Sequence, residues 1–260
     1  SPGDDSPTPA RDAPNPAIGR IVYEPREIHA MQLLKTRACA AALLFPAFLF
    51  VSAGCDIAMA DYSEQETAEW QKTYELSPDG RIEINNVNGK IQVSRGEGNV
   101  VEVYAKRIGK ASSKDAAKTA LEQVQVVDRS EGNVIRVETK VNRSGTILGH
   151  SQSQVEYVLQ VPANAELKVT TVNGGLELTG LDGRIVAEAT NGAIRATGIG
   201  GAIEASTTNG GINVDLVRVS DGGVKLECTN GGISLGVPRD AKATISARVS
   251  NGGIATDGLD

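Results

Sequence analysis

The stretch STTNGGINVDL, residues 206–216, returns twice with small changes, as ECTNGGISL at 227–235 and as RVSNGGIAT at 248–256. In every copy, Asn-Gly-Gly is followed by an aliphatic residue. The return of one turn at a fixed spacing is the sequence signature of a repeat architecture, in which each unit has the same corners. The stretch therefore predicts a fold built from copies of one structural unit.

The repeat is regular from Leu167 onward. If the chain is cut before each aliphatic residue that follows a glycine turn, it gives the segments LKVTTVNGG, LELTGLDGR, IVAEATNGA, IRATGIGGA, IEASTTNGG, INVDLVRVSDGG, VKLECTNGG, ISLGVPRDAKAT, ISARVSNGG and IATDGLD. Segments that end in Asn-Gly-Gly or Asn-Gly-Ala alternate with a second kind, so the unit is about 18 residues long and has two unlike halves. Both 12-residue segments are of the second kind, which places their extra residues at the same corner.

Within a segment, the first and third places are aliphatic or Ala, and polar residues lie between them. This alternation predicts a half-buried β-strand, and Asn-Gly supplies the positive φ that a tight corner needs. The fold class is therefore all-β.

Two all-β architectures fit the pattern. In a β-solenoid or β-roll, each 18-residue coil has two strands stacked in parallel on the next coil, and the corner asparagines form a ladder along one edge. The ladder would contain Asn191, Asn209, Asn230 and Asn251. In an antiparallel β-meander or sandwich, each Asn-Gly is a hairpin turn instead. The constant segment length favours the solenoid, because stacked coils must keep equal lengths.

Residues 73–166 show a weaker form of the pattern, in IEINNVNGK and IQVSRGEGN, together with a predicted helix near 113–125. Ser112 or Ser113 can cap this helix. Its apolar face would consist of Ala116, Ala117, Ala120, Leu121 and Val124. We therefore expect an N-terminal β region at 73–166 and a Gly-punctuated repeat at 167–260, which lacks a polar capping element and is expected to be truncated.

Residues 31–55, MQLLKTRACAAALLFPAFLFVSAGC, have the order of an export signal. Basic Lys35 and Arg37 are followed by an apolar run and then by small residues. The preceding residues 1–30 are rich in Pro and Asp and have no periodicity, which predicts a disordered extension upstream of a translation start at Met31.

The sequence SAGC at 52–55 resembles the lipobox of bacterial lipoproteins. The resemblance implies that the signal is cut before Cys55 and that Cys55 is lipidated, with acyl chains that hold the protein to a bacterial membrane. The alternative is an ordinary secretory signal that is cut after Ala60. Residues 56–72 then form an acidic tether, and the domain faces the periplasm or the cell surface.

The sequence has no residues at the spacing of a catalytic or metal site, and we expect no catalytic, metal-binding or cofactor-binding residues. His150 lies in a polar loop without metal ligands at a suitable spacing, and Cys228 occupies an inward place of the repeat, where a small core residue is expected. Glu188 and Glu204 lie at different places of their strands and do not form a catalytic pair. The net charge of −6, with scattered Lys and Arg, argues against a nucleic-acid partner.

The order of these features resembles the bacterial "putative adhesin" domain family, which is similar in style to the head-GIN adhesin domains. The resemblance rests on the opening IEINNVNGKIQV, the short helix, the strand from Val155 to Pro162 and the Gly-punctuated repeats, and it spans about residues 73–260. It implies a fold of β-strand repeats with an adhesive or structural role, and it brings no functional residues with it.

Two other functions remain open, namely an accessory or regulatory protein of an envelope-stress system and a carbohydrate-active β-helix enzyme. The expected partners are the membrane, through the lipid anchor, and an envelope protein or a glycan. Aromatic residues for a ligand occur only in the N-terminal part, so either a ligand binds near Trp70, Tyr104 and Tyr157 or binding is multivalent and weak.

Overall fold

The computed structural model describes residues 62–77, 79–142, 151–239 and 244–258. The predicted signal at 31–55, Cys55, the extension at 1–30 and His150 lie outside the described residues. In the described part, seventeen β-strands form two large mixed sheets, and a single α-helix lies beside them, which confirms the all-β prediction.

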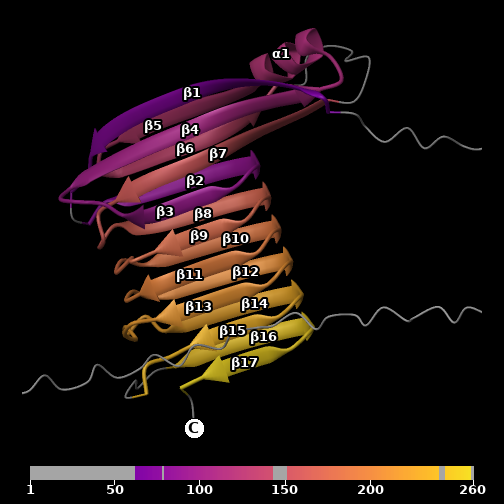
Figure 1. Ribbon diagram of the computed structural model, residues 1–260. Helices are drawn as coiled ribbons and strands as arrows, with labels where there is room; N and C mark the ends of the chain where they lie inside the picture. The colour runs from indigo at the N-terminus through magenta and orange to yellow at the C-terminus, as the bar shows by residue number, and fades with distance from the viewer. Residues whose placement is uncertain (1–61, 78, 143–150, 240–243, 259–260) are drawn as a thin grey trace, which may run out of the picture.

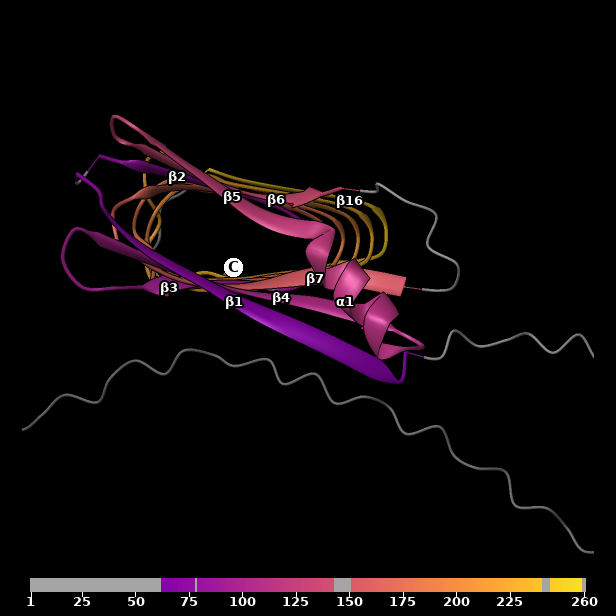
Figure 2. The same ribbon diagram turned by 90° about the horizontal axis from the view of Figure 1, so that it is seen from above.

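The two sheets lie face to face, as Figure 2 shows from above. The nine-stranded sheet consists, in spatial order, of β1 (Glu64–Glu75), β4 (Val100–Ala111), β7 (Ser151–Val161), β3 (Ile91–Arg95), β9 (Leu176–Thr179), β11 (Ile194–Ile199), β13 (Ile212–Leu216), β15 (Ile233–Gly236) and β17 (Ile254–Asp257). The eight-stranded sheet consists of β16 (Ile245–Asn251), β14 (Val224–Asn230), β12 (Ile203–Asn209), β10 (Ile185–Asn191), β8 (Glu166–Asn173), β2 (Arg81–Asn88), β6 (Val134–Val141) and β5 (Val124–Glu131).

From β8 onward, consecutive strands lie in opposite sheets, and strands of the same kind pair in parallel (Figure 1). Ile185 in β10, for example, pairs with Leu167 in β8 and with Ile203 in β12. The 18-residue unit therefore forms one coil with one strand in each sheet. Where a segment has three extra residues, the register is kept, and Ile203 pairs with Val224.

The first coil of the stack consists of β2 and β3. β2 pairs in parallel with β8, with Ile82 opposite Leu167, and β3 pairs in parallel with β9, with Ile91 opposite Leu176. The strands β4 to β7 and the helix α1 (Lys114–Glu122) are therefore inserted between the first and second coils. The sequence-based boundary at residue 167 assigned the first coil to a separate region, because the insertion hides the regular spacing.

The insertion and β1 form the antiparallel part of the molecule. β4 pairs with both β1 and β7, and β5 pairs with β6. β1 begins at Glu64, so the prediction that residues 56–72 form a tether is wrong for residues 64–72. These residues pair along β4 from Ala111 to Val103. Their polar composition reflects an edge strand with exposed side chains, which a tether resembles in sequence.

The predicted helix is confirmed as α1. The Oγ atom of Ser113 accepts a hydrogen bond from the backbone N–H of Ala116 at 3.4 Å, which caps the first turn. Ala117 and Ala120 are buried. The helix lies close to β4, since a Cβ added at Gly109 would be 2.2 Å from the carbonyl oxygen of Ala117. Among the described residues, no helix has the length and apolar composition required to cross a membrane.

The core is a thin layer of Ile, Val, Leu and Ala between the two sheets. Except in the last coil, the first and third places of the segments are buried as predicted; Ile194 and Ala196, for example, are both 0% exposed. Cys228 is 3% exposed, which confirms its position as a small core residue. Its thiol lies 3.1 Å from the carbonyl oxygen of Gly210, to which it donates a hydrogen bond.

Candidate binding face

A ladder of six asparagine side chains runs along one edge of the stack. In each of its five rungs, Nδ2 of one side chain donates to Oδ1 of the previous one, over 2.8–2.9 Å. The members are Asn88, Asn173, Asn191, Asn209, Asn230 and Asn251. The ladder contains the four predicted residues and two more from the first and second coils. Because the amides bind one another, they define the scaffold.

The glycine after each of these asparagines allows the corners to stack closely. A Cβ at Gly192 would lie 1.9 Å from the carbonyl oxygen of Gly174, and a Cβ at Gly210 would lie 2.3 Å from that of Gly192. Gly210 also has a φ of 149°, whereas no described residue other than glycine has a positive φ. Asn-Gly is thus needed here mainly for close backbone approach, and the asparagines do not have the positive φ of a type I′ hairpin turn.

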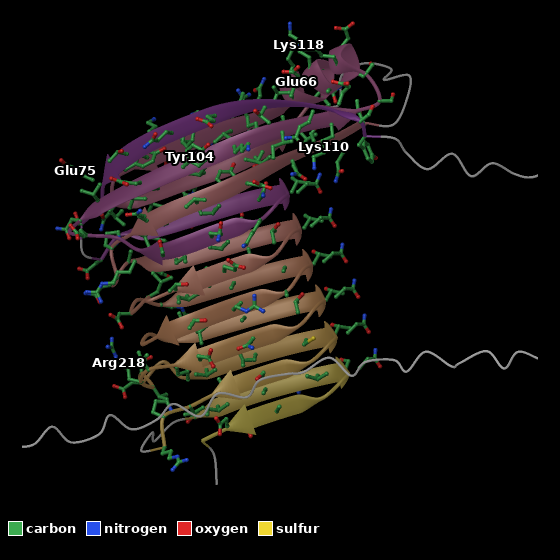
Figure 3. All side chains as sticks on the ribbon, viewed as in Figure 1. Glu66, Glu75, Tyr104, Lys110, Lys118 and Arg218 are labelled. Carbon is green, nitrogen blue, oxygen red and sulfur yellow. The ribbon has the colours of Figure 1, made fainter. Side chains whose placement is uncertain are left out.

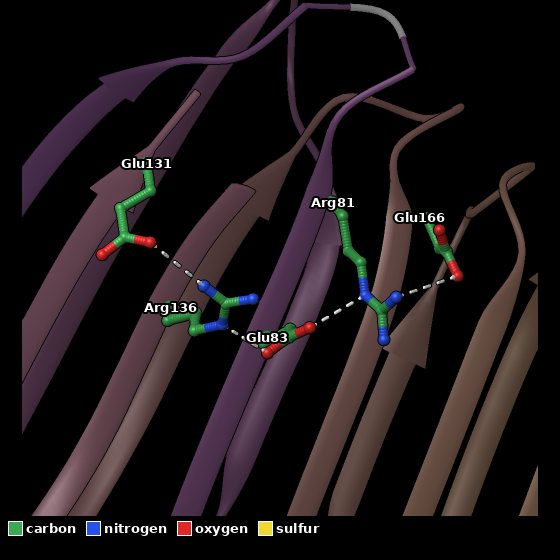
Figure 4. Close-up of polar contacts among 5 residues, drawn as sticks. All are labelled: Arg81, Glu83, Glu131, Arg136 and Glu166. Atoms are coloured by element: carbon green, nitrogen blue, oxygen red, sulfur yellow. Dashed lines mark hydrogen bonds and ion pairs between the residues drawn. The ribbon is translucent and has the colours of Figure 1, made fainter. Parts of the chain in front are cut away.

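The outer face of the eight-stranded sheet is covered by ion pairs. In Figure 4, Arg136 contacts Glu83 at 2.8 Å, and Arg81 contacts the other oxygen of Glu83 at 3.0 Å. Glu131 and Glu166 lie at the two ends of this chain of charges, at 3.8 and 4.0 Å from their arginines. Exposed pairs of this kind contribute little stability, about 0–1 kcal/mol each. Their main effect is that the positive and negative charges balance locally.

The same balance extends along this face to the later coils. Lys225 lies 2.6 Å from Glu204 and 3.7 Å from Glu227. The hydrogen bond from Lys225 holds the pKa of the Glu204 carboxyl below its usual value. Glu188 accepts a hydrogen bond from Thr170 at 3.2 Å. Glu204 is thus stabilised as the carboxylate, whereas a general acid requires a raised pKa.

The outer face of the nine-stranded sheet is different, because an aromatic ring lies on it. Tyr104 in β4 is partly exposed and is outward-facing between the buried residues Val103 and Ala105 (Figure 3). Its register partner in β7 is Val158, which is 43% exposed, and its partner in β1 is Gln71. A partly apolar surface therefore lies near the β1 edge of this sheet face.

The row continues into the coil stack. Val158 pairs with Gln92 in β3, and Gln92 pairs with Glu177 in β9. We call the five side chains across these strands the Tyr104 row; it consists of Gln71, Tyr104, Val158, Gln92 and Glu177. The Nε2 atom of Gln92 donates to Glu177 at 2.9 Å. Lys90 lies 2.8 Å from Glu177, and its hydrogen bond lowers the pKa of this carboxyl.

A second carboxylate lies beside the aromatic ring. A hydrogen bond to Glu69 raises the pKa of the Tyr104 hydroxyl, so this group remains a neutral donor and acceptor at physiological pH. The row thus combines an aromatic ring and an aliphatic side chain with amide groups, each of which can both donate and accept hydrogen bonds.

Of the three aromatic residues expected near a ligand, only Tyr104 lies on the outer face. Tyr157 is 1% exposed, and its hydroxyl lies 2.7 Å from Oγ1 of Thr139 inside the core, so the expectation that it meets a ligand is wrong. Trp70 packs against the core and is partly buried. The physical reason is the alternation of a strand, which turns Tyr157 inward and its neighbour Val158 outward.

No sequence pattern marks Gln71, Val158 and Gln92 as site residues. Each is an ordinary outward residue of its strand, and their proximity follows from the pairing of β1, β4, β7 and β3. Asp182 pairs with Arg218 at 2.9 Å (Figure 3 labels Arg218). No group of three or more His, Cys, Asp or Glu within the described ranges is placed to hold a metal ion.

No protein-family model matches the chain, and no curated protein matches it in sequence. Among solved structures, it is similar to a putative cell adhesion protein from Clostridium sporogenes, with a TM-score of 0.41 and 10% identity over 74% of this chain and 99% of that one. It is also similar to a putative adhesin from Bacteroides fragilis, with a TM-score of 0.31 and 13% identity over 73% of this chain and 97% of that one.

A third similar structure is a putative adhesin from Parabacteroides distasonis, with a TM-score of 0.25 and 10% identity over 73% of this chain and 97% of that one. These three structures are described as a putative cell adhesion protein and as putative adhesins. The fold itself is that of an all-β protein with two mixed sheets and coils that stack in parallel.

Proposed function

We propose that this protein is a non-catalytic adhesive protein of the bacterial cell envelope, in which a β-solenoid domain presents a glycan-binding face. The observation that carries the proposal is the Tyr104 row. It places an aromatic ring and the exposed Val158 between the amides of Gln71 and Gln92, on strands that are held in register by backbone hydrogen bonds. A rigid face loses little conformational entropy when it binds a ligand.

The chemistry of the row favours a neutral sugar. A pyranose ring has an apolar C–H face that can stack on an aromatic ring, and its hydroxyl groups both donate and accept hydrogen bonds, as side-chain amides do. The carboxylates of Glu69, Glu102 and Glu156 lie on the outer face of β1, β4 and β7, where Lys106 is the register partner of both Glu69 and Glu156. The excess of carboxylates over this one lysine disfavours an acidic sugar. A neutral hexose polymer that runs across several strands therefore fits this surface best.

Binding of the folded domain to an array of neutral and acidic polysaccharides tests the proposal. We expect Tyr104→Ala to weaken binding by roughly two- to tenfold, because an aromatic stacking contact contributes about 0.5–1.5 kcal/mol. Tyr104→Phe keeps the ring and should retain most of the affinity.

The matched control is Tyr62→Ala, which removes an aromatic residue that is 41% exposed and lies outside the row. This variant should bind as the parent does. Equal affinities for the parent and Tyr104→Ala, or an absence of binding to every neutral polysaccharide, would contradict the proposal. Capture of an envelope protein without glycan binding would favour the accessory role instead.

The lipid anchor belongs to the same proposal. The sequence SAGC at 52–55 supports it, and β1 begins at Glu64, which leaves a short tether between Cys55 and the first strand. Fatty-acid labelling should require Cys55, and Cys55→Ser should abolish both the label and recovery with the membrane. A Cys55→Ser variant that still carries the label would disprove lipidation at this residue.

A further inference from the structure

The coils continue the Tyr104 row in register beyond Glu177. Glu177 in β9 pairs with Arg195 in β11, and Arg195 pairs with Asn213 in β13. Each of these three side chains points outward between two buried residues of its strand. We call the Tyr104 row together with Arg195 and Asn213 the extended row. It crosses the outer face of the nine-stranded sheet from β1 to β13, so it joins the antiparallel part of the molecule to the coils (Figure 1).

Two planar groups lie on the extended row, on strands that are not neighbours. The ring of Tyr104 is in β4 and the guanidinium of Arg195 is in β11, with β7, β3 and β9 between them. Because paired strands are about 4.8 Å apart, the two groups are separated by about 19 Å. The Arg195 side chain is 64% exposed, so its planar group and its N–H donors face solvent. Only a ligand several units long can therefore contact both groups.

The charges at the centre of the extended row are locally balanced. Glu177 has Lys90 at 2.8 Å and Arg195 at 3.9 Å, and it accepts a hydrogen bond from Gln92 at 2.9 Å. The exposed amides of Gln92 and Asn213 lie on either side of Glu177 and Arg195 in the row. Amide groups both donate and accept hydrogen bonds, as hydroxyl groups do. The row thus presents hydrogen-bonding groups at a regular spacing, which suits a neutral chain of hydroxyl-bearing units.

We propose that the ligand of this face is an extended, unbranched polysaccharide with equatorial linkages, such as a β-1,4-glucan, which lies along the extended row with one sugar on each strand. The inference rests on the glycan binding proposed above, and it adds the shape of the chain and two binding residues, Arg195 and Asn213. An equatorially linked chain is straight, and each of its sugars advances by close to one strand spacing. An α-1,4-linked chain of the same sugar curves and leaves the row after a few units.

Calorimetric titration of the folded full chain with two series of oligosaccharides tests the inference. The probes are β-1,4-linked gluco-oligosaccharides from the disaccharide to the hexasaccharide, and the matched series is α-1,4-linked. Affinity for the β-linked series should rise by roughly twofold or more with each sugar, because each one gains hydrogen bonds in the row. Affinity for the α-linked series should level off after the trisaccharide. Equal affinities for the β-linked disaccharide and hexasaccharide, or the same rise in both series, would overturn the inference.

Substitutions at the coil end of the row separate this inference from glycan binding itself. A disaccharide on Tyr104 does not reach β11 or β13, whereas a hexasaccharide does. Arg195→Ala and Asn213→Ala should therefore weaken the β-linked hexasaccharide by roughly threefold or more and leave the disaccharide unchanged. The matched control is Asn85→Ala, which changes an exposed asparagine on the outer face of the eight-stranded sheet and should alter neither affinity.

The outcomes distinguish a failure of this inference from a failure of the proposed function. If the hexasaccharide binds, needs Tyr104 and is unaffected by both substitutions in the coils, the glycan-binding face stands and the extended row is refuted. If no neutral glycan binds and Tyr104→Ala changes nothing, both are refuted.

Discussion

The first and last coils have the same kinds of residue at the same places, yet their side chains are buried to different extents. In the first coil, Ile82 and Ile84 of β2 are both 0% exposed. In the last coil, Ile245 of β16 is partly exposed, and Ile254 of β17 is 46% exposed. The strands of the first coil have partners on both sides, whereas β16 and β17 are paired on one side among the described residues.

The repeat pattern thus specifies which side chains point inward, while the neighbouring coils determine whether those side chains are buried. At the N-terminal end, the neighbours come from the insertion. β6 pairs with β2, and β7 pairs with β3, so strands of the insertion cover both strands of the first coil. Lys72 of β1 and Asp128 of β5 then meet at 2.5 Å where the two sheets end.

Substitution of an isoleucine by alanine in two different coils should give the largest difference in the free energy of unfolding. Ile194→Ala, in the middle of the stack, removes a side chain that is 0% exposed and should lower the free energy of unfolding by about 2–5 kcal/mol. Ile254→Ala should lower it by less than about 1 kcal/mol, because this side chain is already half in solvent. Denaturant unfolding monitored by circular dichroism measures both values, and similar losses would refute the difference between the coils.

Removal of a buried side-chain amide in the first coil should cause the next largest loss of stability. Nδ2 of Asn86 donates to the carbonyl of Val155 at 2.8 Å, and its Oδ1 accepts from Thr139 at 2.9 Å. Asn86→Ala removes the buried donor to the Val155 carbonyl and leaves Thr139 with Tyr157 as its partner, and it should cost about 2 kcal/mol of unfolding free energy. The adjacent Asn85 is exposed, so Asn85→Ala is the matched control and should change stability by no more than about 0.5 kcal/mol. If the two variants prove equally stable, the buried amide does not connect the insertion to the first coil as we infer.

The pH dependence of stability should show a smaller effect. Burial raises the pKa of Tyr157 to about 12, from its ordinary value of 10.0. Between these values, the unfolded chain loses the phenol proton while the folded chain keeps it. The contribution of Tyr157 to the free energy of unfolding is therefore fully present below pH 10. It falls as the pH rises toward 12, by up to about 1.4 kcal/mol per pH unit.

The check for this prediction is denaturant unfolding of the parent and of Tyr157→Phe across the alkaline range. Phenylalanine has no ionisable group, so the difference between the two proteins should change with pH in the stated direction. A constant difference from neutral pH to pH 11 would mean that Tyr157 ionises as easily in the folded protein as in the unfolded chain.

Local patterns were enough to predict the strands of the later coils, the unit of 18 residues, a helix cap at Ser112 or Ser113 and the buried position of Cys228. They failed at β1, whose charged edge strand resembles a tether in sequence. The candidate site was only partly predictable. Tyr104 was found as one of three aromatic residues, but a short segment does not reveal which strand lies beside β4.

By itself, the sequence determined the corners, the spacing between them and the inward face of each strand, because these depend on residues that are close in the chain. Only the tertiary structure decided that β2 and β3 join the stack across the insertion, with Asn88 and Asn173 bonded although they are 85 residues apart. It also brought Gln71, Tyr104 and Val158 together in one row. The physical reason is that strand pairing is a non-local choice, fixed by the core that the paired strands enclose.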